Sequence, residues 1–60
     1  MNGFYYRVMF EQEKINGNSG LFSVIKIAKN LIKIGKQVRI DAQTKDGIVP
    51  ILSTAELRKL

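Results

Sequence analysis

Residues 21–35 read LFSVIKIAKNLIKIG, and the spacing of their apolar side chains decides the fold. At about 100° per residue, the apolar side chains gather on one face of a helix. This apolar face consists of Leu21, Val24, Ile25, Ala28, Leu31 and Ile32. The opposite face carries Lys26, Lys29 and Lys33 with Ser23 and Asn30. The pattern predicts an amphipathic helix over residues 20–34, capped by Asn18 or Ser19 and ended by Gly35.

A strand is predicted on the N-terminal side of this helix, at residues 4–11, which read FYYRVMFE. Aromatic and apolar residues alternate there with period two, as in a half-buried strand. The side chains expected to face the core are Phe4, Tyr6, Val8 and Phe10. Those expected to face outward are Tyr5, Arg7 and Met9. Residues 12–20 contain Asn16-Gly17, a common turn dipeptide, and are predicted to form a loop.

A hairpin and a short helix are predicted after the long helix. Residues 38–52 contain two apolar runs that flank Asp46-Gly47, a frequent hairpin turn. Pro50 cannot donate a ladder hydrogen bond, which favours an edge position for the second of these strands. Ser53 and Glu56 have the spacing of a capping box, so a short helix is expected over residues 54–60.

These elements predict one α+β domain of 60 residues with the order β-α-β-β-α. A crossover through the long helix would make the first two strands parallel. The expected fold is therefore a three-stranded mixed sheet, order 1-2-3, with the long helix on one face. The other sheet face would stay open. It would carry Tyr5, Arg7, Met9, Arg39, Asp41 and Gln43.

The composition argues against catalysis. The chain has no cysteine and no histidine, which excludes disulfides, thiolate zinc sites and imidazole chemistry. Among the carboxylates only Asp41 has no evident structural role, and a single carboxylate does not make an acid–base pair. We expect no enzymatic activity, no cofactor and no metal. A core this small also favours a homodimer.

Positive charge is the strongest functional signal in the chain. The net charge is +5, and no acidic residue occurs from Lys14 through Ile40. A surface of one sign is typical of nucleic-acid binding through phosphates, although lysines also solubilise ordinary helices. The predicted nucleic-acid-binding residues are Lys26, Lys29, Lys33, Lys36 and Arg39.

The open sheet face offers a second candidate surface. Tyr5, Arg7 and Met9 are residue types enriched in protein interfaces, and Tyr5 could also stack on a base. They are the predicted partner-binding residues if the protein is an interaction module or inhibitor of a phage or mobile-element type, which would bind a larger protein through this open face or through the edge strand. An enzyme fragment or terminal domain of a longer protein, in which the helix after Ser53 continues, is a third hypothesis. The apolar stretch 21–34 is interrupted by three lysines and is too short to cross a membrane, so a cytoplasmic protein is expected.

Overall fold

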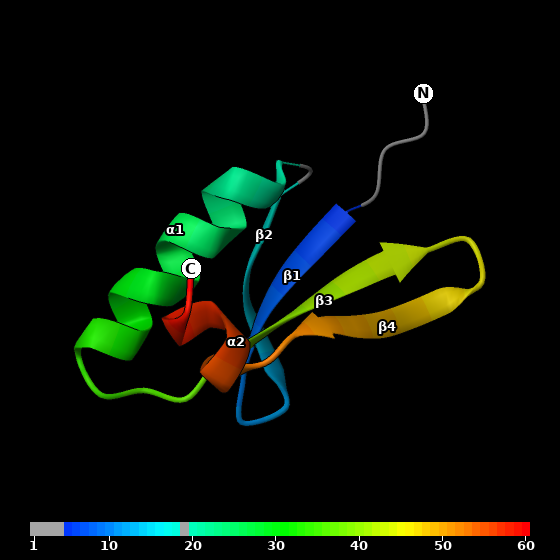
Figure 1. The fold of residues 1–60 in the computed structure, drawn as a ribbon. Helices are drawn as coiled ribbons and strands as arrows, with labels where there is room; N and C mark the ends of the chain where they lie inside the picture. The colour runs from blue at the N-terminus through cyan, green and yellow to red at the C-terminus, as the bar shows by residue number, and fades with distance from the viewer. Residues whose placement is uncertain (1–4, 19) are drawn as a thin grey trace.

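The computed structural model describes residues 5–18 and 20–60, which form four strands and two helices (Figure 1). The elements are β1 (Tyr5–Phe10), β2 (Glu13–Asn18), α1 (Leu21–Lys33), β3 (Arg39–Thr44), β4 (Gly47–Leu52) and α2 (Thr54–Arg58). The strands make one sheet in the order β2-β1-β3-β4, and every neighbouring pair is antiparallel. The α+β class is confirmed. The three-stranded mixed sheet is wrong, because β2 is an additional strand and β1 runs antiparallel to β3.

The strand β2 occupies residues that the sequence predicted to be a loop. It pairs with β1 through a two-residue turn at Glu11 and Gln12, whose φ angles of 51° and 69° match the twist of a tight hairpin. Asn16-Gly17 therefore lies inside a strand and not in a turn. The Asn16 Oδ1 accepts a hydrogen bond from the Gly17 N–H at 2.8 Å. The register shifts between Val8 and Met9, so the strand pair contains a bulge.

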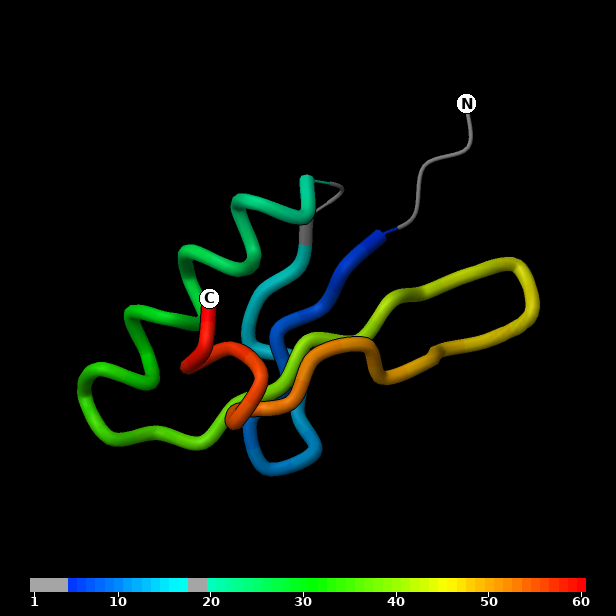
Figure 2. Tube along the Cα trace, viewed as in Figure 1, coloured from blue at the N-terminus to red at the C-terminus, as the bar shows by residue number. Residues whose placement is uncertain are grey.

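The extra strand also explains why the predicted parallel pairing fails. The strands β2 and β3 are each antiparallel to β1, so they run parallel to one another on either side of it. The helix α1 connects these two strands (Figure 2). The crossover that the sequence indicated is present, but it starts from β2 and leaves β1 in the centre of the sheet.

The core lies between the sheet and the two helices. Its fully buried members are Val8, Val24, Ala28, Val38, Ile40 and Leu57. Tyr6 and Phe10 pack against them, as the alternation in β1 predicted, whereas Phe4 lies outside the described residues. The helix α1 turns its predicted apolar face to this core.

The ends of α1 agree only in part with the sequence. Gly35 follows the helix with a φ of 92°, as expected for a glycine that ends a helix. The N-cap is Gly20, later than the predicted Asn18 or Ser19. Ser19 and the side chain of Asn18 lie outside the described residues.

The predicted hairpin forms, and the second helix begins at Thr54 as predicted but ends at Arg58, before the predicted end at residue 60. The Thr44 hydroxyl accepts from the Asp46 N–H at 3.1 Å and donates to the Gly47 carbonyl at 2.9 Å, which closes the β3–β4 turn. The strand β4 is an edge strand, in agreement with Pro50.

The short helix α2 is fixed at its first turn. The Ser53 Oγ accepts from the Glu56 N–H at 3.2 Å, and the Ser53 N–H donates to the Glu56 carboxylate at 2.8 Å. The hydrogen bond from the Ser53 N–H, with a smaller contribution from the Ser53 side chain, lowers the pKa of the Glu56 carboxyl group. The Thr54 hydroxyl donates to the Val38 carbonyl at 2.6 Å and so ties α2 to the segment before β3.

Leu57 is expected to be essential because it is the buried anchor of α2. Leu57→Ala should cost about 2–5 kcal/mol, since it leaves a cavity between the helices and the sheet. Leu60→Ala is the matched control, because its side chain is exposed, and it should change stability by less than about 0.5 kcal/mol. Urea unfolding followed by circular dichroism measures both. Equal unfolding midpoints would contradict this assignment of the core.

Candidate nucleic-acid interface

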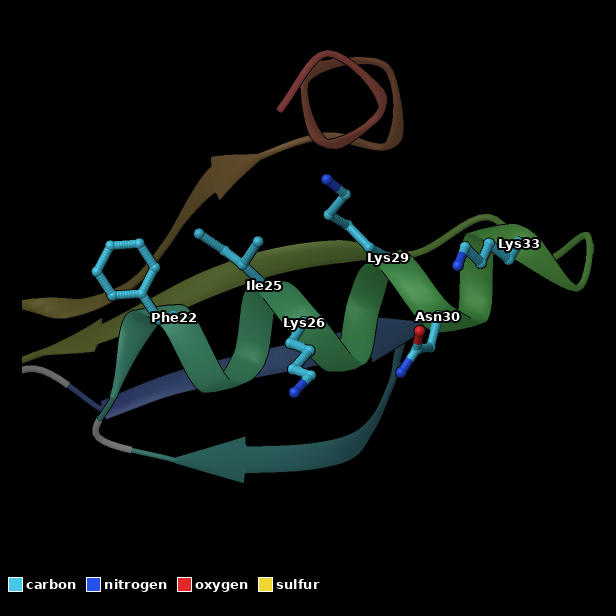
Figure 3. Close-up of a pocket in the computed structure, with 6 residues that line it drawn as sticks. All are labelled: Phe22, Ile25, Lys26, Lys29, Asn30 and Lys33. Carbon is cyan, nitrogen blue, oxygen red and sulfur yellow. The ribbon is translucent and has the colours of Figure 1, made fainter.

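The outer side of α1 carries three lysines, Lys26, Lys29 and Lys33, which we call the basic helix face (Figure 3). They lie outward because the opposite side of the helix is packed on the sheet. Lys26 and Lys33 are exposed. Lys29 is partly buried, and its Nζ donates to the Leu60 carbonyl at 2.6 Å, so it holds the C-terminal residues against α1.

A shallow depression of about 520 Å³ runs along this face. It is lined by Phe22, Ile25, Lys26, Lys29, Asn30 and Lys33 (Figure 3). A smaller hollow between the two helices adds Arg58 of α2 beside Lys29 and Lys33. The basic surface therefore extends from α1 onto α2.

Phe22 and Arg58 were missed by the sequence analysis. Phe22 was assigned to neither predicted face, although helical periodicity places it on the same side as Lys26 and Lys33. Arg58 follows Leu57, the residue that the capping-box pattern directs to the core. Its position next to the buried Leu57 was the only hint in the sequence that Arg58 lies near α1. The packing of α2 against α1 is a tertiary contact, which the sequence pattern does not show.

Two of the five predicted nucleic-acid-binding residues lie apart from the basic helix face. The Lys36 Nζ lies 4.9 Å from the centre of the Phe10 ring, in a cation–π contact. The Arg39 side chain lies on the open face of the sheet and pairs with Asp41, through Nε–Oδ1 at 2.7 Å and Nη2–Oδ2 at 3.2 Å. The structure thus groups the three lysines and separates Lys36 and Arg39 from them.

Asp41 has the structural role that the sequence did not reveal. It is 2% exposed, and Arg7 lies opposite it on β1. The Arg7 Nε is buried and has no hydrogen-bond partner in the part of the chain that the structure describes. The hydrogen bonds and the charge of Asp41 raise the pKa of Arg39. This two-point ion pair fixes Arg39 to its own strand.

The predicted partner-binding residues Tyr5, Arg7 and Met9 share the open sheet face, but they do not form a free platform. Met9 is buried, and Arg7 is partly buried. The Tyr5 ring covers Gly17 so closely that a Cβ there would overlap it. The Lys14 Nζ lies 5.6 Å from the centre of the same ring. The groups that could stack or bind are thus largely engaged within the sheet.

The charges are distributed unequally between the two layers. The strands and their turns carry four basic residues, Arg7, Lys14, Arg39 and Lys45, and four acidic residues, Glu11, Glu13, Asp41 and Asp46. Of the other basic residues, five lie in α1, in α2 or directly after α2, and Lys36 lies between α1 and β3, whereas the acid of the helix layer, Glu56, is held in the capping box. The helix layer therefore carries +4 of the net charge of +5, and Lys36 supplies the rest.

Similarity to known proteins adds no information about this surface. Comparisons with protein families, with curated proteins and with solved structures gave no match. Over residues 5–18 and 20–60, no group of three acidic side chains is placed to hold a metal ion. None of the helices formed by these residues is long and apolar enough to cross a membrane.

Arg39 is expected to contribute to stability through Asp41. Arg39→Met should cost about 1–3 kcal/mol, because it leaves a buried carboxylate without its two-point partner. Lys45→Met removes the same charge from the exposed β3–β4 turn and should have almost no effect. Chemical unfolding compares the two variants. If they unfold at the same denaturant concentration, the ion pair is not a structural element.

Proposed function

We propose that the protein is a small nucleic-acid-binding protein that acts without catalysis or cofactor. The observation that carries the proposal is the basic helix face, which exposes lysines on a helix that contains no acidic residue. Arg58 of α2 extends it. A purely solubilising surface commonly mixes both signs, whereas a phosphate-binding surface is basic throughout.

The geometry suits contacts with the sugar–phosphate backbone. Lys26 and Lys33 lie seven residues apart, which corresponds to about 10 Å along the helix. An ammonium group on a flexible stem binds phosphate as a point charge and does not discriminate between base sequences. Lys29 must exchange the Leu60 carbonyl for a phosphate, so we assign it a smaller contribution. Binding should therefore tolerate many sequences and depend strongly on salt.

Reversal of charge on α1 should weaken this binding strongly. The double variant Lys26→Glu with Lys33→Glu is expected to bind DNA or RNA at least about tenfold more weakly at low salt. The slope of log K against log salt should be about −3 for the wild type and about −1 for the variant. Fluorescence anisotropy with a labelled oligonucleotide measures both quantities.

The matched control reverses two lysines of the sheet layer, Lys14→Glu with Lys45→Glu. This variant has the same net charge as the α1 variant, but its changes lie in β2 and in the β3–β4 turn. It should retain most of the affinity. An equal loss in both variants would show that net charge alone matters, and no binding by the wild type at low salt would refute the proposal.

The edge strand β4 supports a second candidate function, a protein-interaction module. Ile48, Val49 and Ile51 are exposed there. Ile48 pairs with Gln43 and Val49 with Ala42, so apolar side chains lie on both faces of the strand. Long apolar edge strands favour pairing with another chain. The simplest such partner is a second copy, which would enlarge a small core.

This second candidate predicts a dimer that depends on β4. Light scattering should give a mass near twice the 6.8 kDa of one chain, and Val49→Lys should return it to one chain. Ile15→Lys makes the same kind of change on β2, the opposite edge strand, and should leave the dimer intact. A wild-type mass of one chain at about 100 µM would contradict β4 self-association.

A further inference from the structure

The aromatic side chain at the start of α1 is unusually accessible. Phe22 is 88% exposed, the highest value among the exposed large hydrophobic side chains of the described residues. Its ring points away from the helix and sheet at one end of the depression (Figure 3). Burial of a phenylalanine side chain contributes about 1.5–3 kcal/mol to the stability of a folded protein. Because the Phe22 ring is exposed, it adds little to the stability of this fold.

Phe22 lies in line with the basic helix face. Phe22, Lys26, Lys29 and Lys33 follow one another at i, i+4, i+7 and i+11, the spacing of one stripe along a helix. The stripe extends over about 16 Å. Stacked nucleotides rise by about 3.4 Å along one strand, so roughly five of them would match this length.

A ligand for this stripe needs both anionic groups and a flat apolar face. Single-stranded nucleic acid supplies phosphates to the lysines and unpaired bases that stack on aromatic rings. A duplex offers the same phosphates, but its base faces are stacked on one another. An acidic peptide supplies carboxylates without a base to stack. The tyrosine of the sheet cannot take this role readily, because Lys14 and Gly17 already contact the Tyr5 ring.

We infer that the protein binds single-stranded nucleic acid through α1, with one base stacked on Phe22 and the adjoining phosphates on the lysines. This inference rests on the proposed function, and it adds the preference for single strands and the stacking residue. Phe22 is then a binding residue, and the fold itself does not need its ring. The base-stacking role moves from the sheet, where Tyr5 was a candidate, to the helix.

Substitutions of Phe22 test the stacking contact. Phe22→Leu keeps an apolar side chain and a good helix former but removes the ring, whereas Phe22→Tyr keeps the ring. Anisotropy is measured with a labelled 12-nucleotide single strand, with its duplex and with an abasic strand of equal length. Phe22→Leu should weaken single-strand binding about tenfold and leave the other two affinities unchanged. Phe22→Tyr should bind all three as the wild type does.

A tryptophan at the same position reports the contact directly. The chain contains no tryptophan, so Phe22→Trp introduces a single fluorophore of that kind. Its emission should be quenched when the single strand binds and should be little changed by the abasic strand. Circular dichroism melting checks that every Phe22 variant folds as the wild type does, as expected for an exposed side chain.

The outcomes separate this inference from the proposed function. If single strand and duplex bind equally and Phe22→Leu changes neither, the stacking inference is overturned while phosphate binding stands. Polyglutamate that binds as tightly as the single strand would also overturn it. If the wild type binds none of the three nucleic-acid probes at low salt, the proposed function fails as well.

Discussion

The contact between the apolar side of α1 and the central strands β1 and β3 determines the rest of the structure. Val24 and Ala28 pack there against Val8 and Ile40, and all four are buried. Because this contact buries one side of the helix, the lysines on the other side face solvent. Leu57 closes the same core from α2. The position of Arg58 next to the lysines follows from that closure.

The sequence predicted the elements whose signals are local. The 3.6-residue spacing of α1, the alternation in β1 and the Ser53–Glu56 capping box can each be read within one short segment, and each is present. The strand β2 has no such signal. Its residues read EKINGN, with one large apolar side chain, Ile15, and no alternation. Backbone pairing with β1 and the Tyr5 ring over Gly17 stabilise it, and neither contact can be seen in the strand's own pattern.

The candidate site also contains residues that a local sequence pattern predicts and residues whose positions depend on tertiary contacts. The three lysines of α1 were predictable as a group because helical periodicity alone places them together. Lys36 and Arg39 are near them in the sequence, but the chain passes from the helix layer into the sheet between Lys33 and Ile40. Their contacts with Phe10 and Asp41 depend on that passage. The same periodicity places Phe22 beside the lysines, but only the packed structure shows that its ring is exposed.

The separation of charge between the layers has a consequence for how the molecule approaches a partner. With a neutral sheet layer and a basic helix layer, the protein has a dipole roughly perpendicular to the sheet. In the field of a long polyanion such a dipole experiences a torque, and it turns the helices toward the polymer before any contact is made. Collisions in the wrong orientation become rarer, so the encounter rate rises without any new contact. Dissolved salt shortens the range of this field and with it the distance at which the molecule begins to turn.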